Sequence, residues 1–237
     1  MAASTQPIRR FYTQARAHES EGGFSVQLDE RTLRTPGAAR FAAPTRALAE
    51  AIAEEWNAQG EHILPSTMPL TQFAFAAIDH TPQRRGDLVD YVARFGETDL
   101  VCHRAETPAE LVARQAEAWD KLLAWLAAAH GVRLPVVAGV LAADIPAGER
   151  AKLRAAAESL DDFRLTALAQ AAGLAGSAVI ALALLQGVLT PQAAFEAAAL
   201  DDLWSQEKWG VDAEAKARLD RQRAEFASLA RFIAALG

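Results

Sequence analysis

Hydrophobic and polar positions alternate near the N-terminus and predict a small sheet. Phe24, Val26 and Leu28 alternate with polar neighbours, which is the period-two pattern of a half-buried strand. The Asp29-Glu30 pair follows and indicates a hairpin, although the second position of a type I′ turn favours glycine. The pattern predicts strands over residues 9–18, 24–28 and 31–35, with a short further strand around Phe41.

A helical spacing of apolar residues begins after this sheet. Thr45 is a suitable capping residue for the helix. Leu48, Ile52 and Trp56 then recur at intervals of four residues, which places Trp56 near the C-terminal end of the apolar face. A helix laid on a small sheet forms a compact αβ unit, which we expect to end near Pro65.

Helical patterns dominate the rest of the chain. The sequence Thr107-Pro108-Ala109-Glu110 reads as a capping box, with a capping threonine and proline in the first turn, and this helix should stop near Gly131. The stretch 134–145 is apolar but contains proline and glycine, so we expect it to be extended. Further helices are predicted over residues 70–78, 86–95, 147–158, 160–172, 176–187, 191–205 and 212–236.

These elements together predict an α+β fold with two domains. The first is a small N-terminal αβ domain over residues 1–66, with a hairpin-rich sheet and a helix. The second is a larger all-helical domain over residues 67–237. A length of 237 residues is sufficient for two modest domains, each with its own core.

Charge and cysteine content narrow the classes of function. The net charge of −6 argues against a nucleic-acid partner, because neutralising phosphates requires a basic face. Cys102 is the only cysteine, so an intrachain disulfide is excluded and a reducing compartment is favoured. We expect Cys102 to be a small buried thiol, since no activating group accompanies it in the sequence.

One segment raises the question of a membrane. Residues 171–185 are almost wholly apolar, and a membrane-associated protein using residues 171–189 is one alternative. A spanning helix requires about 20 consecutive apolar residues. This run is shorter and contains Gly173, Gly176 and Ser177, which favours a buried core helix.

Candidate catalytic groups are few. The histidines are scattered and none pairs with a second ligand at helical spacing, so we expect no metal site. Glycine-rich phosphate loops are absent and no cofactor is expected. Asp79, His80 and Asp99 could supply acid–base chemistry in a small-molecule enzyme, but without a nucleophile the solvated or capping interpretation is favoured.

Two polar segments, each centred on a tryptophan, indicate recognition of another protein. The segments are Glu54-Glu55-Trp56-Asn57-Ala58-Gln59 and Gln206-Glu207-Lys208-Trp209-Gly210. An indole among carboxylates and amides combines apolar area with directional polar contacts, as binding hot spots do. Core packing is the alternative interpretation of both tryptophans.

At these residues the chain resembles a known family, the assembly chaperones that bind the α subunit of F-type ATP synthase. The N-terminal motifs are Arg10-Phe11-Tyr12, Val26-Gln27-Leu28-Asp29, Arg31-Thr32-Leu33-Arg34-Thr35-Pro36, Pro44-Thr45, Leu48-Ala49, Ala51-Ile52-Ala53 and Glu55-Trp56-Asn57-Ala58-Gln59. The later motifs are Met68-Pro69-Leu70-Thr71, Ala77-Ile78-Asp79, Thr98-Asp99-Leu100, Gln206-Glu207, Trp209-Gly210 and Glu214-Ala215. Glu30 departs from the family, which commonly has glycine in this turn.

The resemblance implies a chaperone with no enzymatic activity and no bound nucleotide. Its implied partner is the newly made α subunit, whose β-contacting surface it would mask until assembly. The implied partner-binding residues are Trp56, Gln206, Glu207 and Trp209, and Trp56 could act indirectly by fixing its helix on the sheet. We expect a monomer in the bacterial cytoplasm, or in the mitochondrial matrix if the chain is a processed eukaryotic protein.

Overall fold

The computed structural model describes residues 8–139 and 145–237. Their elements form two units, and each is described by itself. The first unit comprises the chain up to Gln83 together with Arg231–Gly237, and the second comprises Arg84–Ala230. The predicted division between residues 1–66 and 67–237 concerns folding domains and stays a prediction. The first unit includes the helix after residue 67 and the last residues of the chain.

The first unit contains the predicted antiparallel sheet. Its strands are β1 (Ala15–Ser20), β2 (Gly23–Leu28) and β3 (Arg31–Thr32), in that order across the sheet. The strand expected over residues 9–18 begins later than predicted. The amides of Thr13 and Gln14 donate to the carboxylate of Asp29 instead of to a neighbouring strand. The region around Phe41 contributes backbone hydrogen bonds to the sheet but forms no strand of its own.

The hairpin turn is made by an aspartate. Asp29 has a φ of 53°, in the left-handed region that aspartate tolerates better than most residues. Its carboxylate accepts hydrogen bonds from the amides of Thr13 and Gln14 and from the Thr13 hydroxyl, which hold this conformation. The same hydrogen bonds lower the pKa of Asp29. Asp29, and not the following Glu30, therefore adopts the left-handed conformation in this turn.

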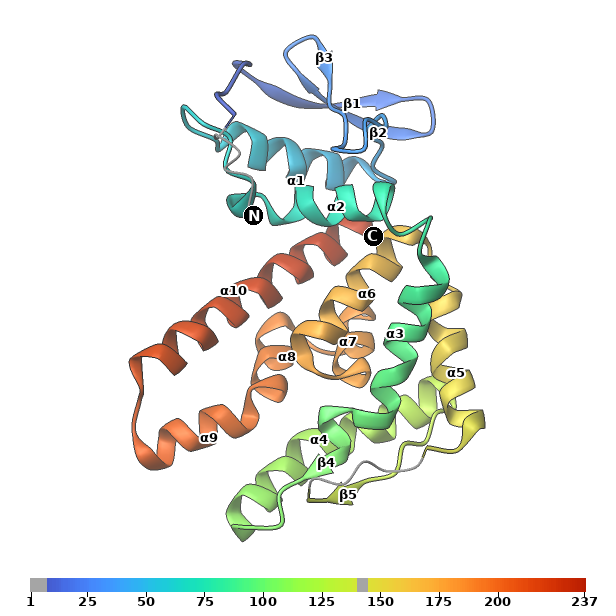
Figure 1. Ribbon diagram of the computed structural model, residues 1–237, viewed down its shortest axis with the longest axis vertical. Coiled ribbons are helices and arrows are strands. Elements are labelled where there is room, and N and C mark those ends of the chain that lie inside the picture. The colour runs from blue at the N-terminus through green and yellow to red at the C-terminus, as the bar shows by residue number, and fades with distance from the viewer. Residues whose placement is uncertain (1–7, 140–144) are drawn as a thin grey trace, which may run out of the picture. The chain divides into compact units, whose positions relative to one another are not determined.

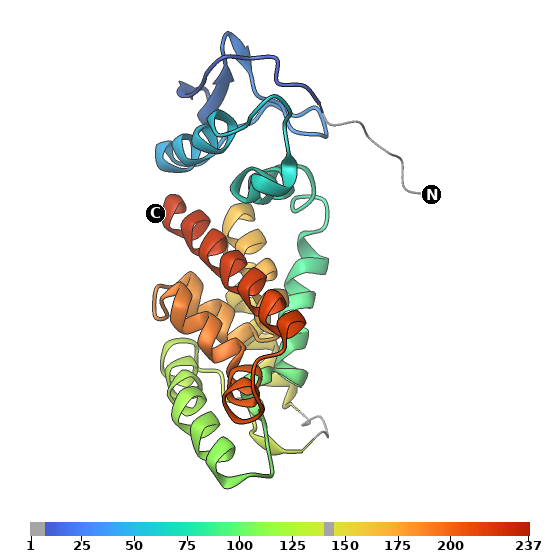
Figure 2. The same ribbon diagram turned by 90° about the vertical axis from the view of Figure 1, so that its left-hand side faces the viewer.

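Helix α1 (Arg46–Asn57) packs on this sheet, as predicted, and lies between the sheet and α2 (Pro69–Asp79) in both views (Figures 1 and 2). Thr45 is its N-cap and accepts a hydrogen bond from the amide of Leu48 at 3.1 Å. The apolar face of α1 buries Leu48 and Ile52 completely. A short 3-10 helix, η1 (Pro65–Thr67), leads into α2.

The second unit is built of helices, with one two-stranded parallel pair (Figure 1). Its helix α6 packs on α7 and on α3, and α3 also packs on α5. Trp119, Phe195 and Phe226 are among its fully buried side chains. The elements are α3 (Arg85–Thr98), η2 (Leu100–Cys102), β4 (His103–Arg104), α4 (Ala109–His130), β5 (Val137–Ala138), α5 (Ala147–Glu158), α6 (Asp162–Ala175), α7 (Ala178–Leu185), α8 (Pro191–Ala198), α9 (Leu200–Trp209) and the part of α10 (Ala213–Leu236) up to Ala230.

Two helix predictions need correction. The helix predicted over residues 191–205 is two helices, α8 and α9, which are separated at Ala199. Trp119 donates its indole N–H to the carbonyl of Ala197, so a distant side chain binds the last turn of α8. The predicted capping box at Thr107 is also wrong. Helix α4 begins only at Ala109, with Pro108 as its N-cap and no side-chain capping bond.

The apolar run of residues 171–185 is divided between two helices. Gly176 ends α6 in the left-handed conformation, with a φ of 64°, and Ser177 caps α7 by accepting from the amide of Ile180. Among the described residues, no helix combines the length and the apolar character that crossing a bilayer requires. The run forms buried parts of α6 and α7, in line with the core interpretation.

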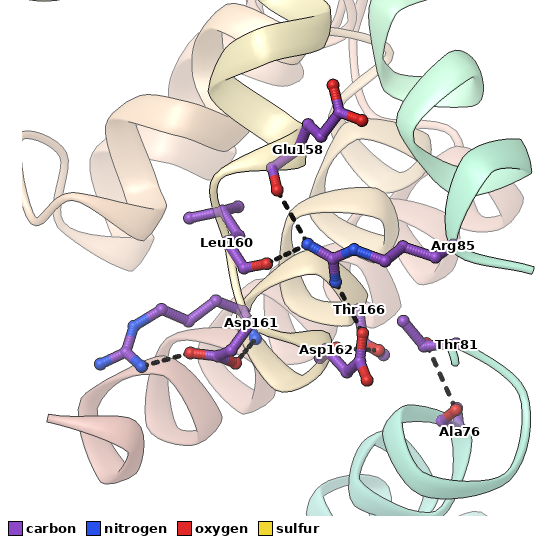
Figure 3. Close-up of polar contacts among 9 residues, drawn as sticks. Ala76, Thr81, Arg85, Glu158, Leu160, Asp161, Asp162 and Thr166 are labelled. Atoms are coloured by element: carbon purple, nitrogen blue, oxygen red, sulfur yellow. Dashed lines mark hydrogen bonds and ion pairs between the residues drawn. The ribbon is translucent and has the colours of Figure 1, made fainter.

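Arg85 connects the start of α3 to the turn between α5 and α6 (Figure 3). Its guanidinium donates to the carboxylate of Asp162 at 2.6 Å and to the carbonyls of Glu158, at 2.9 Å, and Leu160. The Glu158 carbonyl lies at the C-terminal end of α5, where helix carbonyls lack partners within the helix, and Leu160 follows in the turn to α6. Arg85 therefore satisfies groups that neither helix can satisfy by itself.

Candidate functional site

Three of the four predicted site residues lie together on the last two turns of α9. Gln206 and Glu207 precede Trp209, and Gly210 ends the helix with a φ of 93°. The side chain of Trp209 is 76% exposed, the highest exposure among the large hydrophobic residues that the structure describes. Its ring packs edge-on against Trp204 with centroids 5.2 Å apart, while Trp204 itself is buried. Trp204 thus anchors an exposed indole at the helix end.

Two ion pairs join this end of α9 to α4. Both carboxylate oxygens of Glu207 accept from the guanidinium of Arg114, at 2.5 and 2.9 Å. The ammonium of Lys208 lies 2.7 Å from the carboxylate of Glu110, one turn earlier on α4. The hydrogen bonds from Arg114 lower the pKa of Glu207, so its carboxylate is ionised at neutral pH.

A groove of about 470 Å³ lies beside these ion pairs, between α4, α8, α9 and one residue of α10. Ala118, Leu122, Ala193, Ala197, Leu200 and Leu203 supply apolar lining. Charged residues of both signs also line it: Arg114, Glu117, Lys121, Glu196, Glu207 and Arg223. The guanidinium carbon of Arg223 lies over the ring of Phe195, 4.5 Å from the ring centroid. A lining that mixes apolar side chains with charged side chains of both signs is compatible with a surface that binds another protein.

Trp56 has a different environment from Trp209. It lies in the first unit and is only 8% exposed. Its ring is 5.7 Å from that of Tyr12, whose hydroxyl donates to the Trp56 carbonyl at 2.7 Å. The indole N–H of Trp56 is buried and forms no hydrogen bond with any described residue. This placement favours an indirect role, in which Trp56 fixes α1 against the N-terminal segment.

The polar neighbours of Trp56 hold the backbone of the first unit. The buried carboxylate of Glu55 accepts from the amides of Leu70 and Thr71, both at 2.8 Å, and so caps the start of α2. Asn57 exchanges two hydrogen bonds with the backbone of Ala15 on β1. The sequence pattern indicated that these carboxylates and amides are recognition groups. In the structure, Glu55 and Asn57 instead connect α1 to α2 and β1.

The residues of the alternative enzyme hypothesis have structural partners. Asp79 accepts from the Thr35 hydroxyl at 2.6 Å and from the amide of Gly37 at 2.8 Å, and its neighbour His80 is exposed. Asp99 is fully buried and accepts from the amides of Val101 and Ala178. Asp79 therefore holds the turn at Thr35 and Gly37, and Asp99 accepts from amides at the starts of η2 and α7.

Burial also determines the chemistry of Asp99 and Cys102. Desolvation raises the pKa of Asp99 to about 6, although hydrogen bonds from Ser177 and from backbone amides oppose the rise. Desolvation and the nearby Asp99 raise the pKa of the Cys102 thiol to about 12, so it is a poor nucleophile, as expected. Among the described residues, no cluster of three or more histidine, cysteine, aspartate or glutamate side chains could hold a metal ion.

Two members of the site were missed from the sequence. Arg114 and Glu110 occupy one face of α4, about 93 to 98 residues before their partners on α9. The spacing of four residues between them showed that they share a helix face. No sequence signal indicated which helix this face would contact.

Comparisons with known proteins agree with this fold. A model of the ATP12 chaperone protein family matches residues 9–127. The crystal structure of Atp12 from Paracoccus denitrificans is 39% identical, with a TM-score of 0.92 over 97% of this chain and 99% of that chain. A mutant of the P. denitrificans protein is 38% identical, with a TM-score of 0.92 over 97% and 98%. The Atu1473 protein from Agrobacterium tumefaciens is 36% identical, with a TM-score of 0.91 over 97% and 86%.

Proposed function

The chain belongs to the ATP12 chaperone family, and we propose that it assists assembly of the F-type ATP synthase by holding the free α subunit. This membership confirms the family that the sequence motifs indicated, and the related structures confirm the α+β fold class. The proposal assigns no catalytic step to the protein. We infer further that it acts as a monomer in the bacterial cytoplasm, or in the mitochondrial matrix if its source is eukaryotic.

The observation that carries the proposal is the exposed Trp209 at the end of α9, the helix whose Leu203 and Glu207 line the groove. Trp209 is 76% exposed, Val211 close after it is 64% exposed, and the buried Trp204 packs against the Trp209 ring, so large apolar side chains are grouped at the end of α9. Tryptophan is enriched at binding hot spots because it buries a large area while losing little conformational freedom. The charged residues that line the groove suit a partner that must later be released, since interfaces of that kind are only about as apolar as ordinary surface.

The need to cover a free subunit explains why an assembly chaperone would carry such a surface. A free α subunit exposes the surface that later contacts the β subunit, and exposed apolar surface promotes aggregation. We propose that Gln206, Glu207 and Trp209 contact or flank the α subunit until the β subunit displaces the chaperone. Trp56 contributes indirectly, through the stability of the first unit.

Co-expression with the ATP synthase α subunit from the same source tests the proposal. Size-exclusion chromatography should show the two proteins eluting together, with the α subunit kept soluble and the complex lost when the β subunit is added. An α subunit that aggregates while this chain elutes alone would contradict the proposed function. A Trp209→Ala variant provides the site test, because it should weaken co-elution without a change in folding.

Glu207→Lys is expected to weaken binding of the α subunit while leaving the fold intact. The substitution replaces a half-exposed carboxylate by an ammonium next to the Arg114 guanidinium, which introduces repulsion at the proposed interface. Binding is measured by titration calorimetry and folding by circular dichroism. Glu158→Lys, the same charge change on an exposed residue of α5, is the control and should bind normally. Normal binding by a folded Glu207→Lys protein would remove Glu207 from the site.

A further inference from the structure

Two ion pairs with opposite orientation hold the last two turns of α9 in one alignment on α4. On α9, Glu207 is followed by Lys208, and on α4 their partners are Arg114 and Glu110, which lie one turn apart. Glu207 and Lys208 therefore each face an opposite charge on α4. A shift of α9 by one position would bring like charges together, so the two pairs specify one alignment.

The Arg114–Glu207 pair leaves little net charge for a partner to detect. Both oxygens of Glu207 already accept from the two terminal nitrogens of Arg114, and both side chains are about half exposed, at 40% and 54%. A paired carboxylate attracts a basic partner less than a free one does, because the guanidinium charge opposes it. The geometry thus favours a role for Glu207 in placing α9 over a direct ionic contact with the partner.

The position of the α9 end determines the binding surface. Glu207 and Leu203 form part of the groove, and Trp209 follows Glu207 within one turn. The start of α9 is held separately, since buried Gln115 donates to Asp201 at 2.8 Å. Loss of the ion pair should therefore displace the end of α9 without unfolding its first turn.

We propose that Arg114 is a positioning residue for partner binding: its bidentate pair with Glu207 fixes the end of α9 on α4 and so sets the position of Trp209 and the adjacent groove. This inference rests on the proposed binding of the α subunit at the α9 surface. It assigns a role to a residue that the sequence motifs did not include.

A charge exchange tests this role. Arg114→Glu and Glu207→Arg each bring like charges together, and each should weaken binding of the α subunit by about tenfold or more. The double variant restores an opposite pair in the reverse order, and its dissociation constant should return to within about threefold of the unchanged protein. If Glu207 instead contacts the partner directly, the double variant will bind as weakly as Glu207→Arg, and the proposal is overturned. Normal binding by both single variants would also overturn it.

A second measurement does not depend on the partner. Hydrogen exchange of the backbone amides of residues 205–209 should become faster in each single variant and return to its original rate in the double variant. Arg150→Glu is the matched control, because Arg150 and Glu97 form a similarly exposed ion pair between α5 and α3. It should change neither exchange in α9 nor binding. Unchanged exchange in the single variants would show that the pair does not hold α9.

The two measurements separate the proposal from the function on which it rests. If the unchanged protein fails to bind the α subunit, the proposed function fails, and with it the role of Arg114 in partner binding. The unchanged protein could bind, and Trp209→Ala could weaken binding, while the Arg114 and Glu207 variants do not bind as expected. In that case only the role of Arg114 fails.

Discussion

At the scale of single residues, the same substitution should affect stability very differently at the two tryptophans of the polar segments. Trp56→Arg places a charge in a site that is only 8% exposed, and it should lower the free energy of unfolding by about 3–5 kcal/mol. Trp209→Arg, at a site that is 76% exposed, should change it little. Urea denaturation followed by circular dichroism measures both. An unchanged midpoint for Trp56→Arg would contradict its burial.

Asp99 should make stability depend on pH. Because burial raises its pKa from 3.8 to about 6, the folded protein binds more protons than the unfolded chain between these values. The contribution of Asp99 to the free energy of unfolding is therefore fully present below the unfolded pKa and is lost as pH rises through about 6. The free energy of unfolding falls by at most about 1.4 kcal/mol per pH unit in this range.

The Asp99→Asn variant isolates this contribution. Val101 and Ala178 donate to different oxygens of Asp99, and asparagine retains one of these acceptors but does not titrate, so its loss of one hydrogen bond is the same at every pH. The stability of the natural protein relative to the variant should fall as the pH is raised from 4 to 7, as measured by urea denaturation at each pH. A constant difference would show that Asp99 has an ordinary pKa.

At the scale of secondary-structure elements, Arg85 shows how one side chain joins three helices. Arg85→Ala removes the hydrogen bonds to Asp162 and to the carbonyls at the end of α5, and it should destabilise the second unit by about 1–2 kcal/mol. Thermal unfolding followed by circular dichroism measures the loss. The neighbouring Arg84 pairs with exposed Asp87, and such a surface pair contributes little, so Arg84→Ala should unfold almost as the natural protein does. Equal losses of thermal stability in the two variants would show that the Arg85 hydrogen bonds contribute no more than the exposed ion pair of Arg84.

Elements also show where local sequence signals are sufficient. The Thr45 cap and the spacing of Leu48, Ile52 and Trp56 correctly predicted α1, because helix capping and amphipathic spacing are local properties. The break between α8 and α9 was missed because no glycine or proline marks Ala199. There, contacts from Trp119 and Gln115 on α4 accompany the break, and these are long-range contacts.

At the scale of the whole molecule, the end of the chain completes the first unit. Phe232 is fully buried and packs edge-on against Phe73 with ring centroids 5.5 Å apart, and Arg231 pairs with Glu54. Phe232→Ala should cost about 3–5 kcal/mol and accelerate hydrogen exchange in α1 and α2. Phe226 is equally buried, precedes Phe232 on α10 and lies in the second unit. Phe226→Ala should therefore accelerate hydrogen exchange in the second unit instead. The opposite distribution of exchange would contradict this division of α10.

The sequence by itself determined the fold class and the family. Period-two and helical spacing predicted the small sheet, α1 and most later helices, because these patterns reflect which face of each element is buried. Long, ordered motifs, such as Arg31-Thr32-Leu33-Arg34-Thr35-Pro36, indicated the ATP12 chaperones, which the family model and the related structures confirm. The partner-binding role of Trp56, Gln206, Glu207 and Trp209 remains a prediction.

Only the tertiary structure decided what the individual polar residues contact. Glu55 and Asn57 resemble recognition groups in the sequence but bind the backbone of α2 and β1, while Glu207 pairs with Arg114, which is 93 residues distant. A carboxylate has the same chemistry in a cap, in an ion pair and at an interface, and its partner is set by how the helices pack. The burial of Trp56 and the exposure of Trp209 follow from the same cause, since packing between distant segments decides which side of a tryptophan meets solvent.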